Sequence, residues 1–249
     1  MATLGIFDSG SGGLSVYREL VKLLPHERYL FYADNAHCPY GEKTVQYIQD
    51  RACFITDFLL DAGADIIVVA CNTATAAAIA TLREKYVDVP FIGMEPAVKP
   101  AALGTRSGVI GVLATAGTLK GSKYLNTRGR FEDDVTIVEH VGQGFVELVE
   151  NGILDGPEAE ATVRASLQPL LDAGADKIVL GCTHYPFLQP VIERLAGPGV
   201  EVIDPAPAVA RHTLDVMRER GIPYGKGPFS VTLYHSGGPE SLQRIFSLL

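Results

Sequence analysis

The sequence predicts an α/β fold of two pseudo-symmetric lobes, each a mainly parallel sheet flanked by helices, with the active cleft between the lobes. Short β-branched apolar runs alternate with amphipathic segments, as is typical of parallel sheets covered by helices. The segment Asp61–Cys71 (DAGADIIVVAC) recurs as Asp172–Cys182 (DAGADKIVLGC), identical at eight of eleven positions. Each copy ends on a cysteine just past an apolar run, so the repeat predicts a duplicated unit that places one thiol in each lobe.

The elements of the first lobe follow from where apolar runs start and stop. Gly63 ends the longest predicted helix, and Asp65–Ala70 has the continuous apolar, β-branched composition of a strand buried on both faces. In chain order we expect strand Leu4–Phe7, loop Asp8–Gly13, a helix to about Leu24, strand Tyr29–Tyr32, loop Ala33–Lys43, helix Val45–Asp61, strand Asp65–Ala70 and helix Thr73–Glu84.

The pattern then restarts in a second lobe. In chain order we expect strand Gly108–Leu113, exit turn Thr115–Thr118, a helix starting at Ser122–Asn126, strand Val135–Val138, helices Phe145–Glu150 and Glu158–Asp172, strand Lys177–Leu180, helix Phe187–Leu195 and strand Val200–Ile203. The second unit is complete by about Pro205. Helix Ala208–Arg220, strand Val231–His235 and helix Pro239–Leu249 follow, and the last strand and helix are predicted to return to the first lobe. The predicted domains are therefore 1–97 plus 207–249, and 98–206.

Composition excludes several classes of protein. The chain has 249 residues, of which 47% are hydrophobic and 20% charged, with a net charge of −8 and no basic run, so nucleic acid is not expected as a partner. Apolar stretches such as Ile66–Cys71 are too short for a bilayer, and the start lacks a secretory pattern, so no membrane contact and a cytoplasmic location are expected. In a reducing compartment the four cysteines, which lack zinc-like spacing, should be free thiols.

The segment Asp8-Ser-Gly-Ser-Gly-Gly13 joins the first strand to the first helix. Such a glycine-rich turn can bring backbone N–H groups close to an anion. It matches neither the dinucleotide-binding pattern nor the P-loop pattern. A tight turn with an N-capping serine explains it equally well, so this motif alone leaves function open.

The two repeated cysteines stand in similar contexts, Cys71-Asn-Thr73 and Cys182-Thr-His184. A lone cysteine after a buried strand is usually a small core residue, but two in matching frames of a repeat favour a shared function. Asn72, Thr73 and Thr183 can hydrogen-bond polar groups of an amino acid, and a helix N-terminus would lower a thiol's pKa toward neutrality. Two thiols facing each other across a cleft suit removal of a proton from one face of a carbon and its return to the other.

Carboxylates and one histidine are candidates to support the thiols. Asp8 ends the first strand, Glu147 and Glu150 lie on one short helix, and His184 is two positions after Cys182. Each carboxylate could equally be a solvated surface group, and His184 could pack in the cleft wall. Cys53 is expected in a helix core, whereas Cys38 lies in a loop beside Pro39-Tyr40-Gly41 and receives no predicted role.

Four segments together resemble the glutamate racemases, the glutamate branch of the aspartate/glutamate racemase family. They are Phe7–Leu14 (FDSGSGGL), Pro39–Lys43 (PYGEK), Ala70–Ala74 (ACNTA) and Gly181–Pro186 (GCTHYP). Pro-Tyr-Gly and Cys-Thr-His-Tyr-Pro favour the glutamate branch. The resemblance implies interconversion of L- and D-glutamate without pyridoxal phosphate or another cofactor, and a bacterial role in supplying D-glutamate for peptidoglycan. A homodimer is compatible with the sequence, which leaves the oligomeric state open.

Site residues are carried over from this resemblance position by position. It implies Cys71 and Cys182 as the two acid/base thiols, Asp8 as partner of Cys71, and His184 and Glu150 as partners of Cys182, with no metal. Substrate contacts are implied for Asp8, Ser9, Tyr40, Gly41, Asn72, Thr73, Thr115, Thr118, Thr183 and His184.

The segment Ala33–Pro39 departs from the family pattern, which commonly has glycine before the aspartate and arginine near its end. Because His37 and Cys38 stand in this segment, the resemblance implies no chemistry for this loop, whereas the core motifs are unaffected. Alternative functions are a racemase for aspartate or another substrate of the superfamily, a redox protein using Cys71 and Cys182 as a disulfide, and a non-catalytic amino-acid binding module.

Overall fold

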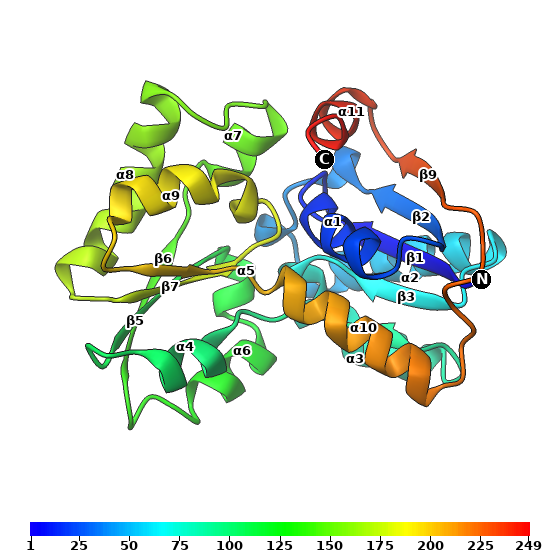
Figure 1. Cartoon of the computed structure of the whole chain (residues 1–249), viewed down its shortest axis with the longest axis horizontal. Helices are drawn as coiled ribbons and strands as arrows, with labels where there is room; N and C mark the ends of the chain where they lie inside the picture. The colour runs from blue at the N-terminus through cyan, green and yellow to red at the C-terminus, as the bar shows by residue number, and fades with distance from the viewer.

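A computed structural model describes residues 1–249 as two α/β lobes lying side by side (Figure 1). The first sheet has the order β4-β3-β1-β2-β9, and the second has the order β6-β5-β7-β8. All neighbouring strands are parallel, which confirms the predicted fold class. The strands are β1 Thr3–Asp8, β2 Arg28–Ala33, β3 Ile66–Val69, β4 Phe91–Ile92, β5 Val109–Ala114, β6 Thr136–Val141, β7 Lys177–Gly181, β8 Glu201–Ile203 and β9 Ser230–His235.

The two sheets repeat one strand order. β2-β1-β3-β4 of the first lobe corresponds to β6-β5-β7-β8 of the second, and β9 is an addition beside β2. The registers correspond too, because Leu4 pairs with Ile66 in the first lobe as Ile110 pairs with Lys177 in the second. Cys71 and Cys182 therefore leave equivalent strands, as the internal repeat predicts.

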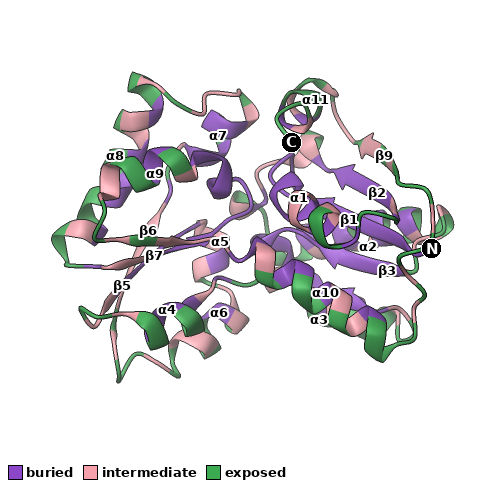
Figure 2. Ribbon diagram, viewed as in Figure 1, coloured by how far each residue is buried: buried purple, intermediate pink, exposed green.

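Helices cover both faces of each sheet. In the first lobe α1 packs against α10 and α2 against α3, while in the second α8 packs against α9 on one face and α4 against α6 on the other (Figure 1). The helices are α1 Leu14–Leu23, α2 Val45–Asp61, α3 Asn72–Lys85, α4 Val98–Gly104, α5 Ala116–Leu119, α6 Ser122–Arg128, α7 Phe145–Glu150, α8 Pro157–Asp172, α9 Gln189–Ala196, α10 Ala206–Glu219 and α11 Glu240–Phe246. The strands β1, β2, β3 and β4 of the first sheet are mostly buried, whereas β9 at its edge and the outer helix faces are partly or fully exposed (Figure 2).

Short elements were missed by the sequence prediction. β4 has two residues between Pro90 and Gly93, and α4 carries Pro100 in its first turn, where proline is tolerated. Short 3₁₀ helices interrupt the loops: η1 Asn35–His37, η2 Tyr40–Glu42 and η3 Tyr185–Leu188. The helix predicted at Phe187–Leu195 is thus a 3₁₀ turn followed by α9.

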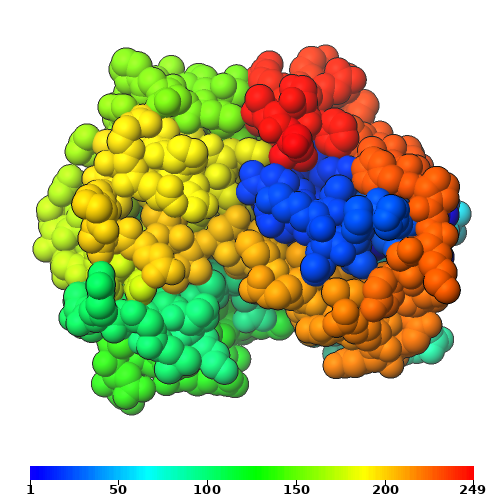
Figure 3. All heavy atoms as spheres, in the orientation of Figure 1, coloured from blue at the N-terminus to red at the C-terminus, as the bar shows by residue number.

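The C-terminal segment bridges the lobes. β9 pairs with β2 and α10 packs on α1, so the strand after the second unit joins the first sheet. α11 then lies against α7 of the second lobe (Figure 3). The domain limits 1–97 plus 207–249 and 98–206 stay a prediction. None of the helices combines the length and the apolar character that a membrane span requires.

The core of the first lobe gives a test of the packing. Ile6 is fully buried on β1, opposite Phe31 and Val68. We expect Ile6→Ala to lower the free energy of unfolding by about 2–5 kcal/mol, because it leaves a cavity in a close-packed interior. Val87→Ala, at a position 73% exposed, should change it by less than about 0.5 kcal/mol. Urea denaturation measures both, and equal effects would contradict the burial of β1.

Candidate active site between the lobes

The carboxyl ends of β1, β3 and β7 meet between the lobes. Cys182 follows β7 directly, and Cys71 follows β3 after Ala70. Thr183, next to Cys182, donates a hydrogen bond at 3.4 Å to Asp8, which ends β1. Both thiols, 4% and 7% exposed, therefore belong to one inter-lobe cleft.

Cys71 is the N-cap of α3. Its Sγ accepts a hydrogen bond from the Ala74 N–H at 3.4 Å, in the place where a serine or threonine hydroxyl usually caps a helix. The thiol in turn donates to Ser9 Oγ at 3.7 Å. The helix start and Ser9 therefore hold the sulfur atom beside the first-lobe loop.

Burial decides the protonation of this thiol. Burial, and then the negative charge of Asp8, raise the pKa of Cys71 well above its ordinary value, although the Ala74 N–H and Ser9 act in the opposite direction. The expected lowering of the pKa by the helix N-terminus is therefore wrong for Cys71, because desolvation outweighs one N–H donor. Burial also raises the pKa of Asp8, against the charge of His184 and the N–H of Gly13 at 2.8 Å.

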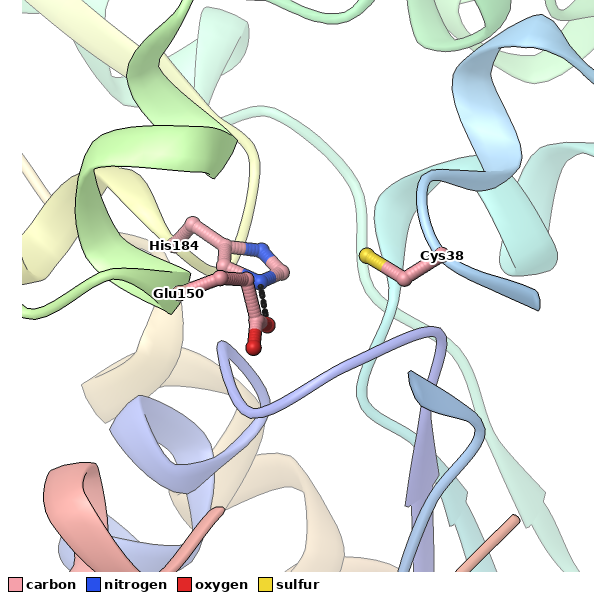
Figure 4. A group of neighbouring side chains, drawn as sticks. All are labelled: Cys38, Glu150 and His184. Atoms are coloured by element: carbon pink, nitrogen blue, oxygen red, sulfur yellow. Dashed lines mark hydrogen bonds and ion pairs between the residues drawn. The ribbon is translucent and has the colours of Figure 1, made fainter. Parts of the chain in front are cut away.

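Cys182 has a different partner. Its Sγ lies 3.7 Å from His184 Nδ1. On the other side of the ring, His184 Nε2 lies 2.6 Å from Glu150 Oε1, as Figure 4 shows. Burial alone would lower the pKa of His184, but hydrogen bonds with Cys182 and Glu150 raise it well above its usual value. Burial would raise the pKa of Glu150, but His184, Ser241 and the Ser11 N–H lower it to about 2. The pair is thus an imidazolium and a carboxylate.

Glu150, not Glu147, is brought to His184. Glu147 lies one turn earlier on α7 and lines a depression near Pro39. The contact with His184 supports Glu150 as the second-lobe carboxylate, and this role stays a prediction.

The glycine-rich loop is shaped by the second lobe. A Cβ on Gly12 would lie 2.3 Å from His184 Nδ1, and one on Gly10 would lie 2.3 Å from Glu150 Oε1. The Ser11 N–H donates to Glu150 Oε1 at 2.8 Å. The loop therefore presents N–H groups to carboxylates of the protein, and its glycines make room for the His184–Glu150 pair.

Asn72 has a side chain without a partner. It is 3% exposed, and neither its amide nitrogen nor its amide oxygen makes a hydrogen bond. An unpaired buried amide costs free energy until another polar group completes its hydrogen bonds. Asn72 opens α3, whose first N–H groups have no intrahelical acceptor.

Three predicted threonines meet across the lobes. Thr73 Oγ1 lies 2.8 Å from Thr115 Oγ1 and 3.3 Å from Thr118 Oγ1. Gly41 of η2 packs on the same Thr115, because a Cβ there would lie 3.3 Å from it. The cluster borders a 690 Å³ depression that residues of both lobes line, although neither Cys71 nor Cys182 is among its lining residues.

Tyr40 is buried, and its hydroxyl is bound by another side chain of the protein. Its hydroxyl donates to Asp34 Oδ2 at 2.5 Å, and Arg51 binds the same carboxylate at 2.7 and 2.9 Å. The hydroxyl is thus engaged by Asp34, and a substrate contact by Tyr40 stays a prediction. Asp34 and Arg51 were not singled out from the sequence, because nothing local pairs them.

Ser241 is a site residue that the sequence prediction missed. It lies on α11, and its hydroxyl donates to Glu150 Oε2 and contacts Ser11 Oγ at 3.0 Å. The Arg244 guanidinium binds the Glu150 carbonyl at 3.1 Å. A serine in a C-terminal amphipathic helix carries no sequence signal for this contact, which depends on α11 folding back to the cleft.

Fold and paired thiols together define a class: the protein is an isomerase of the amino-acid racemase type. Residues 4–213 match the family model described as Asp/Glu/Hydantoin racemase, and the chain belongs to that family. The resemblance inferred from the motifs is thereby confirmed.

Within this family, the chain is similar over nearly its whole length to several glutamate racemases. The chain is 47% identical over 248 residues to a glutamate racemase of Stutzerimonas stutzeri and 48% identical to that of Pseudomonas aeruginosa PAO1. Each alignment covers 100% of this chain and 94% of the relative. A solved glutamate racemase from Bacillus anthracis has a TM-score of 0.89 at 31% identity, covering 99% of this chain and 93% of that one. The Escherichia coli glutamate racemase, solved with L-glutamate and the activator UDP-MurNAc-Ala, has a TM-score of 0.88 at 33% identity, covering 99% and 94%.

The contact between Gly12 and His184 predicts the effect of one methyl group. We expect Gly12→Ala to destabilise the protein by about 1–3 kcal/mol, because its Cβ would overlap the imidazole. Gly199→Ala is the matched control, since a Cβ there meets no atom within 4 Å. Thermal and urea unfolding compare the two, and a silent Gly12→Ala would contradict the close seating of His184.

The ion pair predicts a pH dependence of stability. The lowered pKa of Glu150 stabilises the fold above the unfolded value of 4.5, and this contribution is lost as pH falls toward about 2. We expect wild type to exceed Glu150→Gln in unfolding free energy by up to about 3 kcal/mol at pH 6. The difference should shrink as pH falls from 4.5 to 3. Denaturation at several pH values checks this, and a constant difference would contradict the ion pair.

Proposed function

We propose that the protein interconverts L- and D-glutamate by removing and returning the Cα proton with Cys71 and Cys182, without a cofactor. The observation that carries the proposal is the delivery of one thiol from each of two equivalent strands to one cleft. Inversion at carbon requires an acid/base group on each face, and a pseudo-twofold fold provides that arrangement.

The choice of glutamate is supported by the relatives, which are glutamate racemases at 47–48% identity over the whole chain. It is also supported by polar groups available for an amino acid. In the proposed complex, the unpaired amide of Asn72 and the first N–H groups of α3 bind a carboxylate. Ser9, Thr73, Thr115, Thr118 and Thr183 complete the proposed polar lining, with Tyr40 and Gly41 as its wall.

The two thiols receive different support. In the proposed mechanism, the imidazolium of His184, held by Glu150, stabilises a thiolate at Cys182, which takes the proton in one direction. Cys71 then protonates the planar intermediate from the opposite face. In the reverse direction Cys71 must lose its proton, and Asp8, whose pKa is raised by burial, is placed to assist that loss.

The demanding step is formation of negative charge on Cα beside a carboxylate. A cleft closed to water strengthens each N–H donor that points at the developing charge, and such preorganised donors contribute about 3 kcal/mol each in other enzymes. In a bacterial cell the product D-glutamate would serve peptidoglycan synthesis, and thereby cell shape, from the cytoplasm. Rescue of a D-glutamate auxotroph by the gene tests this role.

The two-thiol mechanism predicts the effect of removing each cysteine. We expect Cys71→Ala and Cys182→Ala each to lower racemisation by at least about a hundredfold in both directions, since each removes an acid/base group. Cys53→Ala, at a half-buried thiol on α2, is the control and should keep full activity. Chiral chromatography of both directions measures this, and full activity in Cys182→Ala would exclude the mechanism.

Isotope exchange tests the reaction itself. With purified protein in D₂O and no added cofactor, deuterium should enter Cα of L- and D-glutamate. The Cys→Ser variants should show exchange that differs between the two enantiomers, because only one face keeps a thiol. Aspartate serves as the comparison substrate. An absence of exchange with either glutamate enantiomer would exclude the proposal, and preferential exchange with aspartate would reassign the substrate.

The unpaired amide of Asn72 is expected to lower the stability of the free protein and to strengthen its binding of glutamate. We expect Asn72→Ala to raise KM for glutamate by at least about tenfold while stabilising the free protein by about 1 kcal/mol, since it removes an unpaired buried amide. Thr56→Val removes another unpaired buried polar atom, on α2, and should stabilise without changing KM. Steady-state kinetics and urea unfolding separate the two effects, and an unchanged KM in Asn72→Ala would contradict the proposed contact.

A further inference from the structure

Cys38 is a third thiol beside the cleft, and the proposed racemisation gives it no role. It lies between η1 and η2, half-buried, and its sulfur points toward His184 and Glu150 of the second lobe (Figure 4). One ligand atom from each of these three side chains lies within 4.8 Å of the other two. The missing Cβ of Gly10 leaves the space between them open, because it would lie 2.3 Å from Glu150 Oε1 and 3.1 Å from Cys38 Sγ.

We propose that Cys38, Glu150 and His184 form an inhibitory site for a soft divalent metal ion, with Zn²⁺ as the defining probe. Thiolate, imidazole and carboxylate are the donors that Zn²⁺ prefers, and three protein ligands with one open position form a common coordination pattern. Ligand atoms around a tetrahedral Zn²⁺ are about 3.3–3.8 Å apart. The sulfur therefore moves inward by roughly 1 Å, and the 2.6 Å contact between His184 and Glu150 opens by somewhat less.

Proton balance follows from the contacts. The ion replaces the proton held between His184 Nε2 and Glu150 Oε1, and it displaces the thiol proton of Cys38, so both protons pass to solvent. His184 Nδ1 stays on the Cys182 side, but the ring is held by the metal and no longer carries an imidazolium charge. If the proposed mechanism is correct, on which the inhibitory effect rests, the support for a thiolate at Cys182 is lost.

The site has its own entrance. Cys38 and Glu150 line a 420 Å³ depression between the η1 loop, α7 and α11, whose other lining residues include Asn35, Ser241 and Arg244. Cys71 and Cys182 are 4% and 7% exposed. An ion entering from the α11 side therefore meets Cys38 and Glu150 before it can reach the paired thiols.

Cobalt spectroscopy on the full-length protein tests the site independently of activity. We expect Co²⁺ to bind one equivalent with a thiolate-to-metal charge-transfer band, and Zn²⁺ to displace it. Cys38→Ala should abolish the band and weaken Zn²⁺ binding by at least about tenfold, since it removes one of three ligands. Cys53→Ala should behave as wild type. Cys38→Ser, of the same size but with a hard donor, provides a second variant if Cys38→Ala does not fold.

Kinetics then test the inhibition. Zn²⁺ should inhibit wild type reversibly, with recovery on addition of EDTA, and the half-inhibiting concentration should rise at least about tenfold in Cys38→Ala, whose metal-free activity stays unchanged. A charge-transfer band and inhibition that persist in Cys38→Ala, or no one-to-one binding by wild type, would overturn the site. If the metal ion binds in a manner that depends on Cys38 but the protein does not racemise glutamate, the site is supported and the proposed function is excluded instead.

Discussion

The seating of the His184–Glu150 pair on the glycine-rich loop is the contact on which the cleft depends. The loop belongs to the first lobe and the pair to the second, and they meet because Gly10 and Gly12 carry no side chain. The Ser11 N–H to Glu150 and the Ser15 hydroxyl to the Thr183 carbonyl, at 2.8 and 2.9 Å, fix the approach. These contacts between the lobes hold Glu150 and the segment of His184, so the same interface that joins the lobes also orients the imidazole beside Cys182.

Equal positions carry unequal charges in the two lobes. The strand registers and the repeat make Asp8 equivalent to Ala114 and Thr73 equivalent to His184. A carboxyl group therefore accompanies Cys71, whereas an imidazolium accompanies Cys182. A carboxylate disfavours a neighbouring thiolate and an imidazolium favours one, so the two lobes offer their thiols opposite electrostatic surroundings.

The strands and the thiol positions could be predicted because their signal is local. Asp65–Ala70 and Lys177–Leu180 are buried β-branched runs, and the structure has strands over Ile66–Val69 and Lys177–Gly181. The contact of the glycine-rich loop with Glu150 could not be predicted, because the two segments are far apart in sequence and meet only when the lobes assemble. The same holds for Ser241. The pKa of Cys71 was misjudged for a related reason: the helix N-terminus is visible in the sequence, but the burial that outweighs it is a property of the assembled lobes.

Burial of polar groups in this cleft opposes folding. Asp8 and His184 are almost fully buried, and the amide of Asn72 has no partner, although an unpaired buried group costs about 1–3 kcal/mol. The apolar clusters on both faces of the first sheet and around the second offset this cost. Donors that are already oriented and dry need no rearrangement when charge develops on a ligand. The same groups that destabilise the free protein can therefore bind a polar ligand that completes their hydrogen bonds. The apolar cores of the two lobes supply the stability that allows these polar groups to stay buried.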